Sequence, residues 1–242
     1  MESSFAQPRL ILLHGTRMNA RQWQPYRTLL GDLRLHAVDL PGHGERAGEE
    51  FTRSSALATV EDAVRRATLE DGVLPVLAGH SLGGYVGALW AAEHPCDLSA
   101  LVLIGATADP AGPLTAVYRG FARVLPHLNA ERTARGMNAL FRGLGAKGEY
   151  AEALPDGSGY AALPDAWRLV IDECGPDLLQ EVACPVWMVN GQLDQMRLHV
   201  RRFAAAAREP RVVTVRKATH LMPATHPEQV AAALRLAVAG TR

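Results

Sequence analysis

The chain has 242 residues, with 25 Lys or Arg and 25 Asp or Glu, so its formal net charge at pH 7 is zero. That balance argues against a protein that grips nucleic acid or an anionic membrane surface through a basic patch. The length suits one sizeable hydrophobic core, and no stretch of linker composition divides the chain into independent halves.

The three cysteines are Cys96, Cys174 and Cys184. Their odd number and scattered spacing fit neither a disulfide framework nor a CxxC metal site. The amino terminus lacks a basic region, and its first apolar run is too short for a signal or membrane helix. We therefore expect a cytoplasmic protein, monomeric or homodimeric, with neither nucleic acid nor membrane as a partner.

Six short apolar runs alternate with helical patterns and are predicted to be strands. They cover residues 9–13, 33–40, 74–78, 101–104, 186–189 and 212–215. Among the intervening helices, one is expected to begin at a cap formed by Ser54 or Ser55. This alternation predicts an α/β fold with a mainly parallel, doubly wound sheet of about six strands, whose ligands bind at the carboxyl ends of the strands.

One long interval, residues 107–183, shows no strand pattern and has several prolines between short helical patterns. Its apolar residues recur at helical spacing, and they are Val117, Phe121, Val124, Met137, Leu140, Phe141 and Leu144. We predict a helical cap inserted into a core made of residues 1–106 and 184–242. Most of these apolar residues are expected to pack inside the cap and a few to line a pocket.

The segment Gly79-His80-Ser81-Leu82-Gly83 lies between a predicted buried strand and a predicted helix. A Gly-x-Ser-x-Gly string in that setting is the pattern of a nucleophile elbow, in which a sharp turn strains the serine backbone and leaves room only for glycines beside it. The turn also points the amide of Leu82 toward a developing oxyanion. We therefore predict Ser81 as a nucleophile.

A serine nucleophile needs a base, and the base needs a carboxylate that orients it. His220 follows the last predicted strand and Asp194 follows the strand before it, so the chain order is nucleophile, acid, base. Asp109 is an alternative acid and His226 an alternative base, although His226 precedes an apparent helix start. The histidines at positions 14, 43 and 80 are expected to lie in turns or to contact the reactive residues as supports, rather than to react themselves.

These motifs together resemble the α/β-hydrolase superfamily, and in particular its small, cap-bearing esterase and lipase-like members. The resemblance rests on His14-Gly15 with Trp23, Asp39-Leu40-Pro41-Gly42-His43-Gly44, the elbow, Gly191 with Asp194, and His220 with Pro227. It implies that Thr16 supplies the second oxyanion-hole donor beside Leu82. The first strand begins so near residue 1 that a six-stranded version of the family sheet is expected.

The loop after His14 departs from the glycine-rich form and reads Gly15-Thr16-Arg17-Met18. Whether Thr16 donates its backbone amide, its hydroxyl or both stays open. Arg17 is expected to be exposed to solvent, with contact to a substrate carboxylate as the alternative.

The predicted activity is hydrolysis of a carboxylic ester of a small molecule through an acyl-enzyme on Ser81. Thioesterase, lactonase and carbon–carbon bond hydrolase or lyase reactions share the same residues and remain alternatives, as does a ligand receptor that keeps the fold without the chemistry. No metal spacing and no dinucleotide fingerprint is found in the sequence, so we expect neither a metal nor a cofactor.

Overall fold

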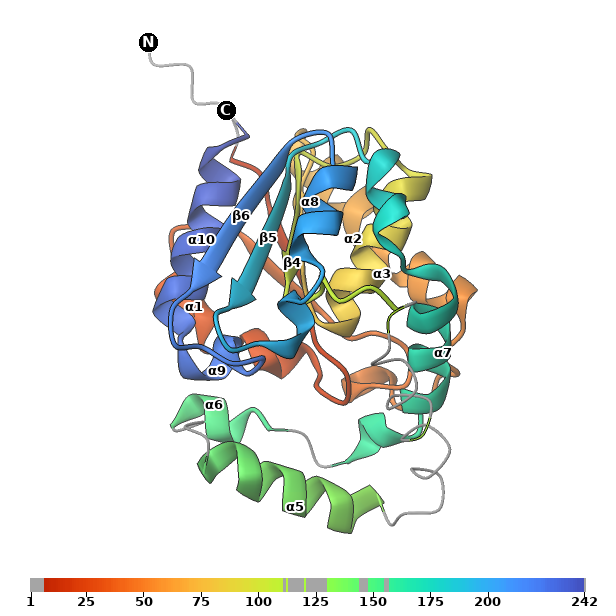
Figure 1. Ribbon diagram of the computed structural model, residues 1–242, viewed down its shortest axis with the longest axis vertical. Coiled ribbons are helices and arrows are strands. Elements are labelled where there is room, and N and C mark those ends of the chain that lie inside the picture. Colours follow the sequence, from red (N-terminus) through yellow and green to blue (C-terminus); the bar gives the residue numbers. More distant parts are fainter. Residues whose placement is uncertain are drawn as a thin grey trace.

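The computed structural model describes residues 7–110, 112, 120, 130–143, 148–154 and 157–241. Its centre is one sheet with the strand order β2-β1-β3-β4-β5-β6 (Figure 1). The strands are β1 (Leu10–Leu13), β2 (Leu35–Val38), β3 (Val76–His80), β4 (Ala100–Ile104), β5 (Val186–Gly191) and β6 (Pro210–Val215). Every neighbouring pair is parallel. The predicted α/β fold and its six-stranded sheet are confirmed.

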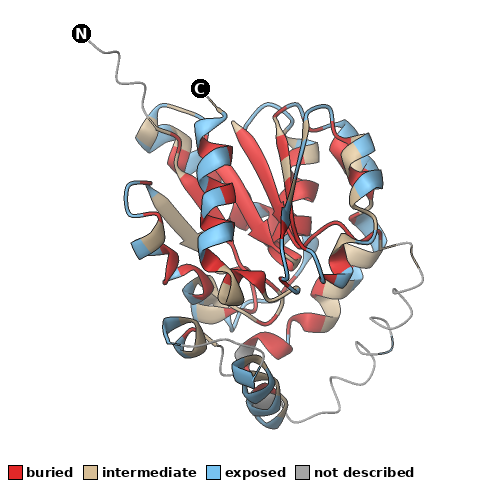
Figure 2. Cartoon of the chain, turned by 60° about the vertical axis from the view of Figure 1, so that its left-hand side comes forward, coloured by how far each residue is buried: buried red, intermediate tan, exposed pale blue. Residues whose placement is uncertain are grey.

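Helices cover both faces of the sheet. One face carries α2 (Arg53–Asp71), α3 (Leu82–Glu93) and α8 (Val200–Ala206), and the other carries α1 (Tyr26–Leu29) and α10 (Pro227–Ala239). Further short elements are η1 (Ala20–Trp23), η2 (Gly44–Arg46), η6 (Gln195–Arg197) and α9 (Met222–Thr225). Figure 2 shows the central strands buried between helices whose outer faces are exposed.

The strands divide their side chains between two hydrophobic clusters. Ile11, Leu13 and Leu77 pack on the α2 and α3 side, while Leu10 and Leu12 pack on the α10 side. Successive side chains of a strand point to opposite faces, so a strand covered on both faces is apolar at every position. This explains why the central strands appear in the sequence as unbroken apolar runs.

The amino-terminal cap of α2 differs from the prediction. Thr52, rather than Ser54 or Ser55, is the capping residue: its Oγ1 accepts a hydrogen bond from the Ser55 amide at 3.0 Å. Ser55 Oγ in turn accepts from the Thr52 amide at 2.9 Å. The reciprocal pair is a capping box, which starts the helix earlier than a single serine cap would. The helix ends at Gly72, whose φ of 69° suits glycine.

The described part of residues 107–183 contains helices and no strand. Its elements are α5 (Ala130–Gly143), α6 (Glu149–Glu152), η4 (Ser158–Tyr160), α7 (Leu163–Glu173) and η5 (Pro176–Gln180). Helices α5 and α6 lie across the carboxyl ends of the strands, whereas α7 packs against α3 beside the sheet (Figure 1). Of the predicted apolar positions, Val117, Phe121, Val124 and Leu144 lie outside the described residues.

The burial of Leu77 on β3 predicts a large effect of truncation. Leu77 is fully buried, whereas Leu69, in the last turn of α2, is 76% exposed. Leu77→Ala leaves a cavity between sheet and helices and is expected to lower the free energy of unfolding by about 2 to 5 kcal/mol. Leu69→Ala, the matched control, should change it by less than about 0.5 kcal/mol. Urea denaturation measures both; equal losses would contradict the assigned core.

Candidate functional site

Ser81 occupies a strained turn between β3 and α3. Its φ of 50° and ψ of −114° lie outside the regions that a serine normally adopts. A Cβ at Gly79 would lie 2.2 Å from the carbonyl of Gly83, and one at Gly83 would lie 2.6 Å from the Leu13 Cβ. Both positions therefore require glycine. The turn holds the Ser81 hydroxyl just beyond the carboxyl end of β3, at the middle of the sheet.

The structure brings Ser81, His220 and Asp194 together although they lie up to 139 residues apart in the chain. His220 Nε2 is 3.1 Å from Ser81 Oγ. On the other side of the ring, His220 Nδ1 is 3.1 and 3.2 Å from the two carboxylate oxygens of Asp194. Asp194 is buried and also accepts a hydrogen bond from the Met196 amide at 2.8 Å. These are the contacts through which a carboxylate orients an imidazole beside a hydroxyl.

Two glycines make room for the Asp194–His220 pair. Gly191 ends β5, and a Cβ there would lie 2.4 Å from the Ala218 carbonyl oxygen. The loop after β5 and the loop after β6 are joined at the same place, where the Leu193 amide donates a hydrogen bond to the Ala218 carbonyl at 2.8 Å. Gly105, at the end of β4 with a φ of 58°, has its missing Cβ 3.0 Å from both Asp194 Oδ2 and His220 Nδ1. No local pattern points to Gly105, because its importance comes from the two distant loops that carry Asp194 and His220.

Thr16 and Leu82, the two predicted oxyanion-hole residues, lie on the same cavity as Ser81. No hydrogen bond joins the Thr16 or the Leu82 amide to another of the described residues. The two segments that carry them are tied together, because the Gly83 amide donates to the His14 carbonyl at 3.1 Å. Gln22 Oε1 accepts from the Gly15 amide at 3.0 Å and so holds the loop before Thr16.

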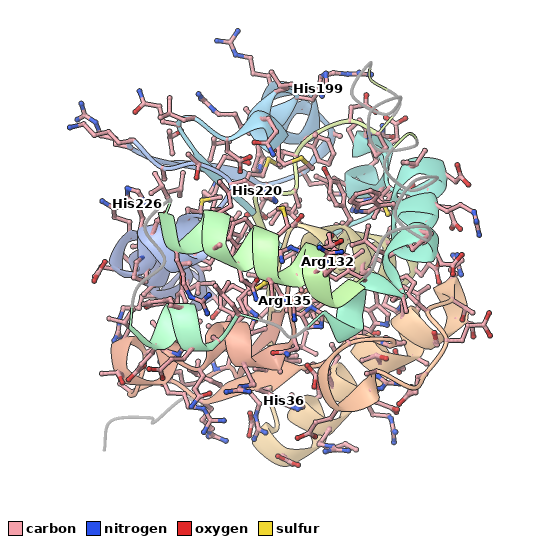
Figure 3. All side chains as sticks on the ribbon, turned by 90° about the horizontal axis from the view of Figure 1, so that it is seen from below. His36, Arg132, Arg135, His199, His220 and His226 are labelled. Carbon is pink, nitrogen blue, oxygen red and sulfur yellow. The ribbon has the colours of Figure 1, made fainter. Side chains whose placement is uncertain are left out.

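The cavity above Ser81 has a volume of about 340 Å³ and lies between the sheet and the segment that contains α5. Most of its wall is apolar and includes Leu82, Tyr85, Met137, Phe141, Trp167 and Met196. Figure 3 looks onto this end of the molecule, with α5 in front carrying Arg132 and Arg135. An apolar cavity with a few convergent polar groups is the usual form of a small-molecule site.

Known proteins resemble this chain in sequence and in architecture. A family profile described as "Alpha/beta hydrolase family" matches residues 10–233. A pimeloyl-[acyl-carrier protein] methyl ester esterase of Xanthomonas campestris is 31% identical over 96% of this chain and 95% of its own length. The enzyme of that name from Nitrosospira multiformis is 37% identical, over 44% of this chain and 41% of its own length. A thermophilic esterase from Thermogutta terrifontis superposes with a TM-score of 0.77 at 22% identity, covering 97% of this chain and 90% of the esterase.

The chain belongs to the alpha/beta hydrolase family. Family membership and the esterase relatives confirm the predicted enzyme class, a hydrolase of carboxylic esters. The predicted likeness to esterase members of the superfamily is confirmed by the same findings. No helix in the described part of this hydrolase combines the length and the apolar composition that a membrane span requires.

The alternative acid and base of the hydrolase have other partners. The Asp109 carboxylate forms an ion pair with Arg202, although Asp109 lines the same cavity. His226 lies between α9 and α10, where its Nδ1 is 2.9 Å from the Thr225 hydroxyl. Figure 3 shows His226 lying apart from His220. Asp194 is the carboxylate within hydrogen-bonding distance of His220.

His80 and Gln22 support the site together; the sequence predicted a supporting role for His80 but did not point to Gln22. Gln22 Oε1 accepts from Gly15, so its Nε2 donates to His80 Nδ1, 3.2 Å away. His80 Nε2 must then carry the proton, which it donates to the His220 carbonyl at 3.1 Å. The chain of contacts links the Thr16 loop to the loop that carries His220. Placing Gln22 there required the tertiary structure, because seven residues and a turn separate it from Gly15.

The expectation that Arg17 is exposed is wrong. Only 8% of its surface is accessible, and it lines the cavity that Ser81 shares. Its guanidinium lies over the Phe141 ring, 4.2 Å from the centroid, and its Nη1 donates to the Tyr160 hydroxyl at 3.4 Å. Burial lowers the pKa of Arg17 from its usual value. The segment that contains α5 and η4 covers Arg17, which no local sequence pattern predicts.

Among the described residues, no group of three His, Cys, Asp or Glu side chains is arranged to hold a metal ion. All three cysteines are free, with Cys174 and Cys184 buried and Cys96 exposed.

Two buried histidines predict how stability depends on pH. Burial lowers the pKa of His14 and of His80 from 6.5 to about 3. Between those values the unfolded chain binds protons that the native protein does not, so stability must fall as the pH falls. From pH 6.5 toward pH 5, each histidine should lower the free energy of unfolding with a slope that approaches about 1.4 kcal/mol per pH unit.

Urea denaturation at a series of pH values measures this slope. His14→Gln removes one titrating group. The slope of its unfolding free energy against pH should therefore be smaller than that of the unchanged protein by the amount that one bound proton contributes, which approaches about 1.4 kcal/mol per pH unit. A free energy of unfolding that stays constant over this range would show that the two imidazoles are not held neutral.

Proposed function

We propose that Ser81, His220 and Asp194 form the catalytic triad of this ester hydrolase. The contacts of 3.1 Å between His220 and Ser81 and of 3.1 Å between His220 and Asp194 support the proposal. His220 Nε2 takes the hydroxyl proton while Ser81 Oγ attacks the ester carbon, and Asp194 stabilises the imidazolium that forms. The ring then protonates the leaving alcohol. Water, activated by the same imidazole, releases the acid and restores Ser81.

The oxyanion is proposed to bind between the amides of Thr16 and Leu82. The Leu82 amide lies at the amino-terminal end of α3, where the N–H groups of the first turn favour negative charge. Two hydrogen bonds hold this wall of the site, one from the Gly83 amide to the His14 carbonyl and one from the Gly15 amide to Gln22 Oε1, and they support a pair of donors that is preorganised for the substrate. Donors of this kind contribute about 3 kcal/mol each to transition-state stabilisation.

The substrate is proposed to be a small alkyl ester of an acyl chain that occupies the apolar cavity. Two observations support it: the walls of the cavity are mainly apolar, and a relative that matches over 95% of its own length carries the name of a methyl ester esterase. Thioester and lactone hydrolysis would use the same residues, so these substrates belong in the same assay panel. A receptor without chemistry would not need the aligned triad.

Residues 107–183 are proposed to act as a cap domain on a core made of residues 1–106 and 184–242. The position of α5 and α6 across the strand ends supports the assignment, and their residues form one wall of the cavity. We also propose that the protein is cytoplasmic, that it is a monomer or a homodimer, and that it does not bind nucleic acid. The free cysteines and the zero net charge fit that setting.

Labelling with a fluorophosphonate tests the triad without a known substrate. Intact mass spectrometry should show one adduct on the unchanged protein and none on Ser81→Ala. The adduct should form normally on Ser54→Ala, a matched control at an exposed serine. His220→Ala should form it at least about 10³-fold more slowly, because the serine loses its base.

Ester hydrolysis provides the second measurement. With short-chain methyl esters, Asp194→Asn is expected to lower kcat by about 10⁴-fold because the imidazole loses its orientation and its counter-charge. Asp109→Asn, at the rival acid, should have a much smaller effect. The proposal fails if the folded, unchanged protein takes up no adduct, or if Asp109→Asn is the more damaging substitution.

A further inference from the structure

Arg17 is a buried cation beside the proposed reaction centre. It directly follows Thr16, and its φ of 57° places a non-glycine residue in the left-handed region. Arg17 lines the same cavity as Ser81 and His220. Arginine is rarely buried unless it is paired, so this position calls for an explanation.

The described surroundings of Arg17 are aromatic rather than acidic. The Phe141 ring lies 4.2 Å from its Cζ, and the Tyr160 ring lies 6.0 Å away. Tyr160 also accepts the hydrogen bond from Nη1. Among the described residues, Arg17 takes part in no ion pair, and its Nη2 is buried without a hydrogen-bond partner. The Asp109 carboxylate, which lines the same cavity, is paired with Arg202.

This arrangement suits an anion that arrives with the substrate. The Phe141 ring and the Tyr160 hydroxyl hold the guanidinium in place, and its Nη2 stays buried without a hydrogen-bond partner. A buried charge without a partner is unfavourable, and a bound anion would offset that cost. A guanidinium matches the planar geometry of a carboxylate, and the low dielectric of an apolar cavity strengthens their attraction.

We propose that Arg17 binds a free carboxylate of the substrate, so that the preferred substrate is an ester that carries a second, ionised carboxyl group. The inference rests on the proposed function, because it assigns the substrate class of that same site. Arg17 makes no covalent bond and transfers no proton. It holds the free carboxylate at one end of the substrate while the ester carbon lies at Ser81. Because the cavity has a volume of only about 340 Å³, the carboxylate and the ester must belong to one small molecule.

The test compares matched esters that differ in one charge. Monomethyl esters of dicarboxylic acids, with a range of chain lengths, are compared with the dimethyl esters of the same acids. In the monomethyl esters the free carboxylate is on the acyl part of the ester. In a second series, the acetyl esters of hydroxy acids, the free carboxylate is on the alcohol part. The ratio of kcat/KM for the charged ester to that for its neutral counterpart is expected to exceed one at the best chain length.

Arg17→Met should lower that ratio by about 100-fold, because a buried charge pair loses one partner. Arg21→Met, an exposed arginine four residues along, should leave the ratio as it is. Arg17→Lys should restore part of the ratio. In addition, the free dicarboxylate should inhibit the unchanged protein competitively and Arg17→Met much more weakly.

Two outcomes would overturn the proposal. If Arg17→Met lowers kcat/KM equally for charged and neutral esters, Arg17 only ties its loop to Phe141 and Tyr160. If the unchanged protein shows no preference for a charged ester in either series, no carboxylate binds there. Both are distinguishable from failure of the proposed function, because fluorophosphonate labelling of Ser81 reports the triad independently of any ester.

Discussion

The backbone around Ser81 approaches its neighbours too closely for side chains, and the rest of the site depends on that approach. Gly79 lies against Gly83, and Gly83 lies against Leu13 and His14 at the end of β1. The close contact turns the chain sharply from β3 into α3 and leaves Ser81 with a positive φ. Such strain persists only when surrounding structure holds it, which here is the parallel sheet on both sides of β3.

Polar contacts between loops place the remaining groups relative to Ser81. The loop after β5 carries Asp194 and is bonded to the loop after β6, which carries His220. Gln22 and His80 connect the His220 carbonyl to the Thr16 loop. Because His80 is neutral in this chain, it can accept from Gln22 and donate to His220 at the same time. His80 is neutral because burial lowers its pKa, so the packing around His80 also determines how many protons its ring carries.

In the part of the chain that the structure describes, the cavity combines apolar walls with a cation, Arg17, that has no ion-pair partner. The low dielectric of an apolar cavity strengthens a hydrogen bond or ion pair that is formed there. It also makes a polar or charged group without a partner unfavourable. Most polar groups near Ser81 avoid this cost through partners within the protein, as Asp109 does with Arg202. Arg17 is different, since aromatic rings and a phenol surround it. Its environment therefore favours binding a small anionic molecule over contributing to stability.

The sequence by itself determined the six strands, their parallel arrangement and the order of Ser81, Asp194 and His220. These features have local signals: largely apolar runs bounded by turn residues, and reactive residues soon after them. Because parallel strands end at one edge, such residues meet there whatever their separation in sequence.

Only the tertiary structure decided the roles of Gly105, Gln22 and Arg17. Gly105 matters because two other loops pack against it, and Gln22 because it reaches His80 from another strand's loop. Arg17 stands in a polar loop that favours exposure, yet Phe141 and Tyr160 cover it from more than 120 residues away. Burial depends on what packs against a residue, and a local pattern contains no information about a segment that far along the chain.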